Sequence, residues 1–594
     1  MFRRTTLKPT GEPQSDTAQS RLVKLTACAA FIGLAAGGVA FVLVHTIGLL
    51  TNLALLHRWG WDLPSLTGFS IGPSTYAVAI GGALIVSLLA KWSPVIRGHG
   101  IPEAMEAILT NQSRIAPRAA IAKPLSAAIA IGTGGPFGAE GPIIVTGGAI
   151  GSLLGQVLHV TPNERKILLA SGAAAGMAAV FGSPLAAVIL AIEILMFEFS
   201  ARSFIPLVVA TSVAAGVHSA LFSSGPLFTV PPHHFSGLGQ LPVFAVLGLL
   251  CGLLAAVICS GLFFIEGLYR KLPVSEFWHA PIGAFLFVSV AILEPRTLGV
   301  GYDVIDDALA TRLALGSLAL IGLVKLVVWW LALASGTSGG TLAPVLMISA
   351  CFGATLGELL HRLIPSLNIS SGSIALVAMA ATFGAATRAT FAAIVFVFEL
   401  TRDYNAILPL MLATVLATLV ASWLSHDSLL TEKLTRRGLI VPREYHIDVL
   451  ESARVADVMT RSVIALDVNT TVGAAVKEFA RSGHSAYPVT DADQLCVGII
   501  TRGDLLSGDL DDNARLADVA VREVISAVAD SSIAAALALM HEEDVDHLPV
   551  LDAGGRLVGI CTSSNVLSAR KGYNTADRVQ RGWLDRGRPG VVSD

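Results

Sequence analysis

A succession of apolar segments from Leu25 to about Leu424 constrains the fold more than any other feature of this sequence. A helix that crosses the hydrocarbon core of a bilayer needs about 20 residues, whereas several segments are nearer 16 and others exceed 25. Irregular backbone at membrane depth survives only where it is buried in protein or lines a polar cavity. The pattern therefore predicts a mainly α polytopic membrane domain with short, tilted and broken helices. The segments are 25–56, 76–92, 117–135, 142–158, 166–181, 184–198, 204–222, 240–268, 280–294, 313–334, 342–364, 372–400 and 405–424.

Charge is distributed unevenly along the 594 residues. Only 14% of the chain is charged, but 35 charged residues fall in the 144 positions from Glu451 to Asp594. A membrane part is therefore followed by a part of ordinary soluble composition. The net charge of −3 argues against a role in nucleic-acid binding, which needs a basic face. Because no nucleophile–base arrangement or metal cluster is visible, we do not expect an enzyme.

Basic residues flank the membrane part on both sides. Cytoplasmic loops of membrane proteins carry an excess of Lys and Arg. We therefore expect a multi-pass protein of the cell membrane with a cytoplasmic N-terminal segment (1–20), a membrane domain (21–435), and a linker (436–454) leading to a cytoplasmic tail. The flanking cations are Arg3, Arg4, Lys8, Arg21 and Lys24 before the first segment, and Lys433, Arg436, Arg437 and Arg443 after the last.

The soluble tail contains an internal repeat of about 60 residues. One copy begins V-A-D-V-M-T at Val455–Thr460 and ends G-I-I-T-R-G-D at Gly498–Asp504. The other begins L-A-D-V-A at Leu516–Ala520 and ends G-I-C-T-S-S-N at Gly559–Asn565. Each copy predicts strand, helix, strand, strand and helix, so we expect an α/β module of two domains, 455–508 and 515–570, before a C-terminal tail (571–594).

Three stretches of the membrane part place glycines before a proline near a helix start. They are G-H-G-I-P-E at Gly98–Glu103, G-P-F-G-A-E-G-P at Gly135–Pro142 and S-G-G-T-L-A-P at Ser338–Pro344. A helix N-terminus presents unpaired N–H groups and a partial positive charge, which attract an anion without holding it as tightly as a full cation. Any one break is explained by a structural kink. Three breaks of one construction favour an anion pathway.

Glu140 lies inside the second break. Burying an ionisable acid at membrane depth costs free energy, so such a residue suggests a functional site. A carboxylate at a helix N-terminus also mimics the anion, so an ionised Glu140 would plug the site and a protonated or displaced one would open it. The alternative is a glutamate that only caps its own helix.

With these motifs the chain resembles the CLC family of chloride channels and anion/proton exchangers, whose signatures are G-S-G-I-P, G-K/R-E-G-P and G-x-F-x-P. The resemblance covers about residues 20–435, and the tail resembles paired cystathionine-β-synthase (CBS) domains. It implies a homodimer with one pathway per subunit, each built from two inverted halves. It also implies that Glu140 is the gate, that N–H groups of Thr341 and Leu342 bind a central anion, and that N–H groups of Ala139, Glu140, Gly141 and Ala343 form an outer site.

The central site departs from the family pattern. His99 replaces the serine that donates to the central anion, which implies nitrate preference or pH sensitivity, or else a histidine that faces away from the pathway. Leu342 replaces the usual phenylalanine, which matters little because its backbone is the ligand. The family's central tyrosine is missing, and Leu430 stands at its place.

The proton-relay position departs as well. Exchangers of the best-known type carry an inner glutamate next to the structural glutamate, which here aligns with Glu193, and the relay position holds Ile194 as in family channels. Glu198, about one helical turn away, could substitute but is better explained as a solvated helix end. Glu399 resembles the family's structural acid.

CBS pairs often hold an adenosine nucleotide between the two domains. Thr501 and Asp504 match the ribose-contacting pattern G-h-x-T/S-x-x-D fully, and Thr562 and Asn565 match it except for the amide. The alternative is a purely structural or dimer-stabilising module. No cofactor is required for transport in either case.

The sequence thus predicts Glu140-gated passive permeation of chloride or a similar monovalent anion. Anion/proton antiport on the same scaffold is the main alternative. A CBS-regulated divalent-cation carrier would want several carboxylates at membrane depth, whereas the apolar runs hold few (Glu140, Glu193 and Glu399). A fluoride exporter is more distant, since those relatives alter the first motif differently.

Overall fold

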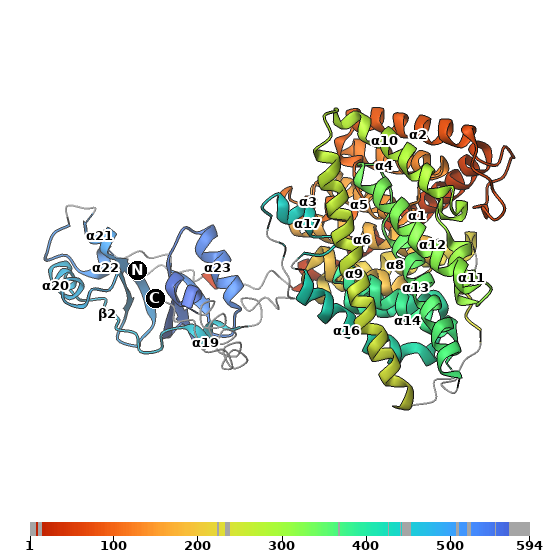
Figure 1. Ribbon diagram of the computed structural model, residues 1–594. Coiled ribbons are helices and arrows are strands. Elements are labelled where there is room, and N and C mark those ends of the chain that lie inside the picture. Colours follow the sequence, from red (N-terminus) through yellow and green to blue (C-terminus); the bar gives the residue numbers. More distant parts are fainter. Residues whose placement is uncertain are drawn as a thin grey trace. The chain divides into compact units, whose positions relative to one another are not determined.

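The computed structural model divides the chain into two compact units, which are described separately (Figure 1). One unit spans Arg21–Tyr445, and the other combines His446–Asp594 with Met1–Ser20. The structure describes residues 8–9, 15–222, 225–231, 238–365, 369–425, 427–439, 441, 453–506, 510–519, 524–552 and 554–568. The predicted segments 1–20 and 436–454 lie largely outside these residues, and the tail 571–594 lies wholly outside them.

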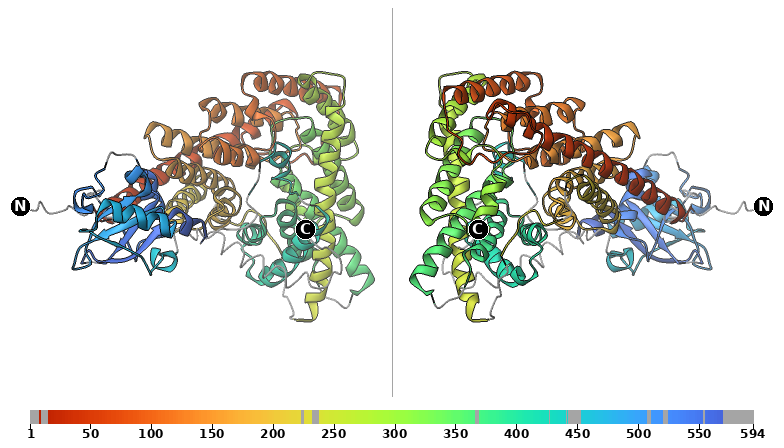
Figure 2. Two further views of the ribbon diagram at one scale, coloured as in Figure 1. Left: turned by 90° about the vertical axis from the view of Figure 1, so that its left-hand side faces the viewer. Right: turned by 90° about the vertical axis from the view of Figure 1, so that its right-hand side faces the viewer.

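The Arg21–Tyr445 unit is built from helices of very different lengths, and α1 is a continuous helix along its outside (Figure 2). The longer helices are α1 (Ser15–Ala54), α2 (Pro73–Trp92), α4 (Pro117–Gly132), α5 (Glu140–Val157), α6 (Pro162–Phe181), α8 (Ala201–Leu221), α9 (Leu241–Arg270), α10 (His279–Ala291), α12 (Leu315–Ala334), α13 (Leu342–Leu363), α14 (Ser371–Thr387), α15 (Thr390–Thr401) and α16 (Ile407–Leu424). The shorter ones are η1 (Pro94–Ile96), α3 (Ile101–Thr110), α7 (Pro184–Ala191), η2 (Ile192–Met196), η3 (Leu238–Gln240), η4 (Glu276–Trp278), η5 (Pro295–Thr297), α11 (Tyr302–Leu309), η7 (Tyr404–Ala406) and α17 (Glu432–Arg436).

The predicted mixture of long and short apolar helices is confirmed. Seven helices among the described residues are long and apolar enough to cross a membrane. The single segment expected at 372–400 is wrong, because the chain breaks between α14 and α15. Arg388 adopts a left-handed conformation there (φ 65°), and its guanidinium donates to the carbonyls of Ala421 (2.9 Å) and Ser425 (2.7 Å). A break without glycine or proline leaves no local signal in the sequence.

The helices of this unit form an internal repeat. The order α4, α5, α6, α7, α8 recurs as α12, α13, α14, α15, α16. The same neighbours pack in both halves, since α5 lies on α6 as α13 lies on α14, and α6 contacts α8 as α14 contacts α16. α6 and α14 form the centre: every residue of 167–181 and of 372–387 is buried. Their many alanines and glycines allow the backbones to approach closely.

Two glutamates join the halves by capping each other's helices. The carboxylate of Glu399 on α15 accepts from the N–H groups of Leu185 (3.1 Å) and Ala186 (2.7 Å), at the start of α7. Glu193 on η2 accepts from Phe391 (3.2 Å) and Ala392 (3.0 Å), at the start of α15. Each carboxylate therefore satisfies the unpaired N–H groups of a helix in the other half.

The second unit is α/β and contains two sheets. One sheet has the order β2 (Leu466–Asp467), β3 (Ala486–Thr490), β4 (Cys496–Thr501), and the other has the order β1 (Lys8–Pro9), β5 (Ile525–Val528), β6 (His547–Leu551), β7 (Leu557–Thr562). In both, the first strand of the repeat pairs in parallel with the second, and the second pairs antiparallel with the third. The helices are α19 (Val455–Val458), α20 (Val472–Ser482), α21 (Arg502–Leu506), α22 (Leu516–Val519) and α23 (Ile533–Glu542).

The short helix that opens each repeat packs on the other repeat. Val455 of α19 is fully buried in the apolar core around α23, β6 and β7. Leu516 of α22 is fully buried in the core around α20, β3 and β4. The two sequence repeats therefore fold as one interlocked module.

Candidate functional site

Three helix starts meet inside the Arg21–Tyr445 unit. The segments in front of them are paired, by a parallel bridge between Gly98 and Ser338 and an antiparallel bridge between Gly138 and Gly340. The three glycine–proline motifs thus lie side by side, although they are far apart in the sequence. The first residue of each helix and the residue before it are Ile101 and Gly100 for α3, Glu140 and Ala139 for α5, and Leu342 and Thr341 for α13.

Glycine is required where these segments touch. A Cβ on Gly141 would overlap the carbonyl oxygen of His99, and one on Gly340 would lie 2.5 Å from Oε2 of Glu140. Real Cβ atoms do not come this close to an oxygen, so any other residue would push the helix starts apart. The glycines therefore serve close backbone approach at these two positions.

The Glu140 side chain occupies the meeting point. It is only 1% exposed, and the N–H groups of Glu140 and Ala343 face its carboxylate. Oε1 accepts a hydrogen bond of 2.7 Å from the phenol of Tyr302, while Oε2 is buried without a hydrogen-bond partner. The carboxylate thus fills the space in which an anion would meet the same N–H groups.

Tyr302 was missed from the sequence. It is the first residue of α11, after Gly301 in a left-handed conformation (φ 83°), so a fourth helix start joins the other three. The stretch G-V-G-Y at 299–302 carries glycines but no proline, and this absence hid it. Its glycine pattern was the available signal.

Two buried lysines, also missed, hold the segments before two of these starts. Lys123 on α4 donates to the carbonyls of Ile96 and Gly98, each at 2.8 Å, before α3. Lys325 on α12 donates to Thr297 and Gly299, each at 2.9 Å, before α11. Both side chains are fully buried, so each cation is stabilised by carbonyl dipoles and stiffens a turn.

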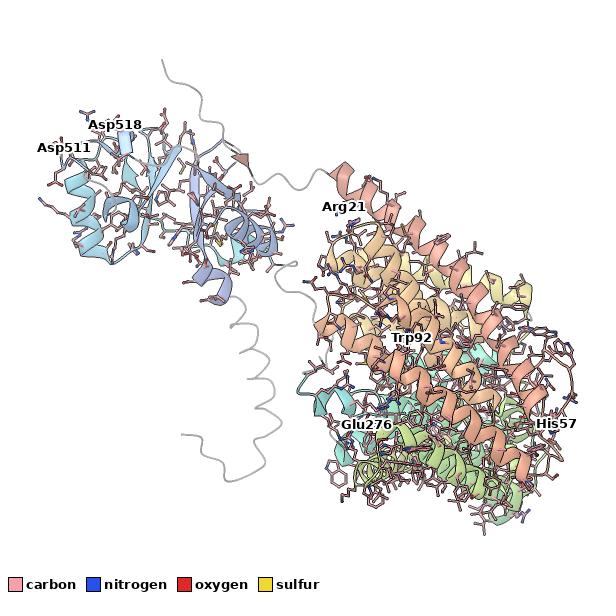
Figure 3. All side chains as sticks on the ribbon, turned by 90° about the horizontal axis from the view of Figure 1, so that it is seen from above. Arg21, His57, Trp92, Glu276, Asp511 and Asp518 are labelled. Carbon is pink, nitrogen blue, oxygen red and sulfur yellow. The ribbon has the colours of Figure 1, made fainter. Side chains whose placement is uncertain are left out.

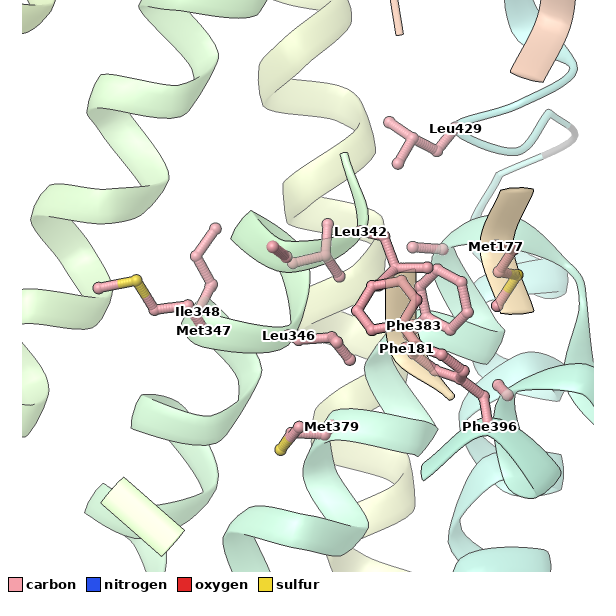
Figure 4. Close-up of a cluster of buried hydrophobic side chains, with 14 of the residues drawn as sticks. Met177, Phe181, Leu342, Leu346, Met347, Ile348, Met379, Phe383, Phe396 and Leu429 are labelled. Carbon is pink, nitrogen blue, oxygen red and sulfur yellow. The ribbon is translucent and has the colours of Figure 1, made fainter. Parts of the chain in front are cut away.

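His99 lies against the segment that lacks the family tyrosine. Its ring is 1% exposed, interacts with the backbone of Leu429, and leaves Nδ1 without a hydrogen-bond partner. Ser338, beside it through the Gly98 bridge, has a buried Oγ that is likewise unpartnered. Figure 4 shows Leu429 in an apolar cluster with Leu342, and Leu430 instead lines a cavity.

The other predicted anion-binding residues are buried at the same helix starts. Ala139 and Thr341 each precede a helix, and Gly141 and Ala343 each occupy its second position. The structure therefore brings His99, Ala139, Glu140, Gly141, Thr341, Leu342 and Ala343 into one place.

Two cavities adjoin this place, and a third lies beside Ile194. One of about 350 Å³ reaches Ala139 and Tyr302, and contains His45, Asp62 and His218. A second of about 480 Å³ reaches Gly98. It is lined by charged side chains, among them Arg97, Arg270, Lys433, Arg436 and Arg437. The third, of about 440 Å³, is lined by Glu193, Ile194 and Leu430.

The relay position is apolar in space as well as in sequence. Ile194 is buried on η2, one residue beyond Glu193, whose carboxylate is committed to the N-terminus of α15. Glu198 is about half exposed and lies 3.5 Å from the Lys166 ammonium.

In the CBS unit the predicted nucleotide residues form helix caps. The N–H and Oγ1 of Thr501 donate to Oδ2 of Asp504 (2.7 and 2.8 Å) at the start of α21. Thr562 makes the same pair of bonds to Oδ1 of Asn565 (2.9 and 2.7 Å). The two threonines therefore bind their own helix starts, which accounts for the repeated pattern without any ligand.

His547 of the second repeat contacts the first repeat. His547 Nε2 and Ser485 Oγ lie 2.8 Å apart. Burial lowers the pKa of His547 below its ordinary value, and the Asp546 carboxylate only partly opposes this shift. The ring is therefore neutral at pH 7.

Apolar helices long enough to span a membrane, with converging N-termini and a buried acid among them, define a polytopic membrane protein. Comparison with known proteins gives its family. The model "Voltage gated chloride channel" matches residues 81–422, and CBS domain models match 455–511 and 516–572. The chain therefore belongs to the CLC family of anion transport proteins, with a C-terminal CBS pair.

Two relatives agree with this assignment, and a solved structure shares the fold. The chain is 30% identical to the H(+)/Cl(-) exchange transporter ClcA of Vibrio campbellii, over 61% of this chain and 82% of that protein. It is 25% identical to the chloride channel protein CLC-f of Arabidopsis thaliana, over 88% of this chain and 76% of that protein. A slow cyanobacterial Cl-/H+ antiporter has the same fold, with a TM-score of 0.62 and 24% identity over 70% of this chain and 97% of that one.

Proposed function

We propose that the protein conducts chloride or a similar monovalent anion passively across the cell membrane, through a pathway that Glu140 opens and closes. The carboxylate of Glu140 seated at the meeting helix N-termini carries this proposal. Carboxylate and chloride bear the same charge, so they compete for the same N–H groups. Protonation or rotation of the side chain frees the site for the anion.

The apolar relay position favours passive permeation over exchange. Ile194 cannot carry a proton, the Glu193 carboxylate caps α15, and Glu198 faces Lys166. Both acids near Ile194 are therefore engaged by other groups, which disfavours a proton relay through either of them.

Anion/proton antiport is the second candidate. It is favoured by the exchange activity in the name of the Vibrio relative. The cavity of about 440 Å³ beside Ile194 also has room for water molecules, which can carry protons in place of an acid.

Flux measurements on purified protein in chloride-loaded liposomes distinguish the two. We expect chloride efflux that requires a potassium shunt and moves no protons. A chloride gradient that drives protons uphill would establish antiport and show that Ile194 does not block the proton route. The same assay with nitrate or fluoride tests selectivity at His99, because a neutral imidazole offers one donor and a charged one two.

Charge asymmetry supports a cytoplasmic N-terminus and tail. Arg21 and Arg202 both pair with Glu164, which places the starts of α1, α6 and α8 on one face. His57 follows the opposite end of α1 (Figure 3). Arg437 also pairs with Glu106 on α3, so the basic α17 approaches the end of the unit where α3 lies. Protease access to the tail in right-side-out and inside-out vesicles tests the orientation.

Two partners are proposed from the family resemblance. A homodimer is tested by the mass of the purified protein in detergent. Adenosine nucleotide binding is tested by calorimetry on the full chain, with Asp504→Ala as the comparison. The helix-capping role of Asp504 supports the alternative of a purely structural pair.

A further inference from the structure

The phenol of Tyr302 is aimed at the carboxylate of Glu140. The hydrogen bond is 2.7 Å long and joins α11 in the second half to α5 in the first. A phenol that donates to an ionised carboxylate makes a charge-assisted bond, which is stronger than one between neutral groups. The bond is lost when the side chain swings out of the site.

The Tyr302 ring is held in place by aromatic packing. Phe181 and Phe228 contact its ring edge-on, with centroids 6.3 and 6.0 Å away. The turn before it is fixed by Lys325, which donates to the carbonyls of Thr297 and Gly299. The hydroxyl is therefore positioned before Glu140 arrives, so little conformational freedom is lost when the bond forms.

We propose that Tyr302 is the latch of the gate: its O–H holds the ionised Glu140 carboxylate in the outer anion site and so lengthens the closed state. This inference rests on the proposed gating role of Glu140. Tyr302 is a positioning residue, because it acts on the anion only through Glu140. Its place in the second half makes opening depend on both halves of the repeat.

Other charged groups lie near Glu140 and Tyr302, and they remain unchanged in every variant at position 302. Lys325 interacts electrostatically with Glu140, and Asp303 interacts in turn with Lys325. Asp303 accepts from the hydroxyl of Ser65 at 2.5 Å. The cavity of about 350 Å³ that reaches Tyr302 is also lined by His45, Asp62 and His218. A change in the pH dependence of chloride efflux can be assigned to the Tyr302–Glu140 hydrogen bond only if the change is absent when Glu140 is replaced.

The first test is Tyr302→Phe in the full-length protein, assayed as chloride efflux from liposomes across pH. We expect efflux at about pH 7.5 to rise by about tenfold, the size expected for losing a hydrogen bond to a charged group. At low pH, where Glu140 is protonated, the variant and the wild type should converge. The matched control is Tyr76→Phe, which removes a phenol that donates to Ser289 (3.0 Å) on α10. Unchanged efflux at all pH values in Tyr302→Phe would overturn the latch.

The second test separates a latch from a merely structural tyrosine. In a Glu140→Ala background there is no carboxylate to hold, so Tyr302→Phe should change efflux by less than about twofold. An equal increase in both backgrounds would show that Tyr302 acts elsewhere.

A third variant strengthens the hydrogen bond to Glu140 instead of removing it. Incorporation of 3,5-difluorotyrosine at position 302 keeps the ring and makes the phenol a stronger donor. Efflux near pH 7 should then fall below the wild-type rate, and a rise would contradict the latch. This variant also decides the matter if Tyr302→Phe fails to fold.

The outcomes distinguish the latch from the proposed function. Chloride efflux that depends on Glu140 but ignores Tyr302 would overturn only the latch. Efflux that depends on neither residue would overturn both.

Discussion

The two halves of the membrane unit share a backbone plan but differ in the side chains they place at the anion site. α5 begins with Glu140, whereas its counterpart α13 begins with Leu342. Two residues before α3 lies His99, and two residues before α11 lies Val300. At these two pairs of equivalent positions, the carboxylate and the imidazole thus come from the first half, and apolar residues stand in the second.

In the proposed pathway, this difference separates two tasks. The helix N-termini of both halves would attract the anion through their backbone N–H groups. One carboxylate, which only the first half supplies, would control its entry. A second carboxylate at the equivalent start would put two like charges close together, at a high free-energy cost in a buried site.

The largest effect on chloride efflux should come from replacing Glu140, the acid that has no counterpart in the second half. Glu140→Gln keeps the shape of the side chain and removes its charge, so chloride efflux should no longer vary with pH between about 4.5 and 7.5. The wild type should conduct more as pH falls, because protonation releases the gate. We expect efflux at pH 7.5 to rise by more than about tenfold, because this variant removes the charge that holds the gate in the site and not only the hydrogen bond from Tyr302. A variant that keeps the wild-type pH profile would show that another group gates the pathway.

The buried lysines test whether the halves are equally stabilised. Lys123→Met and Lys325→Met each leave two buried carbonyls without a donor, at about 1–3 kcal/mol per unsatisfied group. Both variants should melt at clearly lower temperature in detergent. Only Lys325→Met should also raise efflux at neutral pH, because only that lysine fixes the turn before Tyr302. Equal flux in the two variants would contradict this distinction.

Glu193 and Glu399, which cap helices of opposite halves, should lower stability by similar amounts when each is replaced. Glu193→Gln and Glu399→Gln each weaken a helix cap of two N–H groups, so each should lower the free energy of unfolding by about 1 kcal/mol. Glu198→Gln is the control, because a half-exposed ion pair with Lys166 contributes little. Thermal unfolding in detergent measures all three. A large difference between Glu193 and Glu399 would mean that one has a further role.

The smallest effect is expected at Leu342. Its side chain lies in a buried apolar cluster with Leu346 and Phe383 (Figure 4), and we expect only its backbone N–H group to meet the anion. Leu342→Met conserves volume and should change the efflux rate by less than about threefold. A larger change in the same assay would show that the side chain itself contacts the anion.

The sequence predicted the parts of this site that follow from local backbone chemistry. Glycine and proline mark helix starts, so α3, α5 and α13 could be located from their motifs alone. Glu140 could be singled out because an acid is rare among apolar residues. Tyr302 could not, since its helix start lacks proline and a tyrosine is ordinary in apolar surroundings.

Hydrogen bonds between segments far apart in the chain could not be predicted from the sequence, for a different reason. Lys325 reads as one cation in an apolar run, and nothing local indicates that its partners are the carbonyls of Thr297 and Gly299. The left-handed break at Arg388 was hidden because its stabilising partners, Ala421 and Ser425, lie on another helix. Such features depend on which segments meet in space, which periodicity does not encode.

In the CBS unit, the short helix that opens each repeat (α19 or α22) packs on the other repeat. This packing limits how the tail can be shortened, in an experiment or during evolution. A chain that stops between the repeats keeps α20, β3 and β4 but loses Leu516, which completes their core. It also leaves Val455 exposed, because the core that covers it is gone. Neither repeat is therefore a removable part. Truncations within the tail should behave as all-or-none lesions, and the pair should be gained or lost together during evolution.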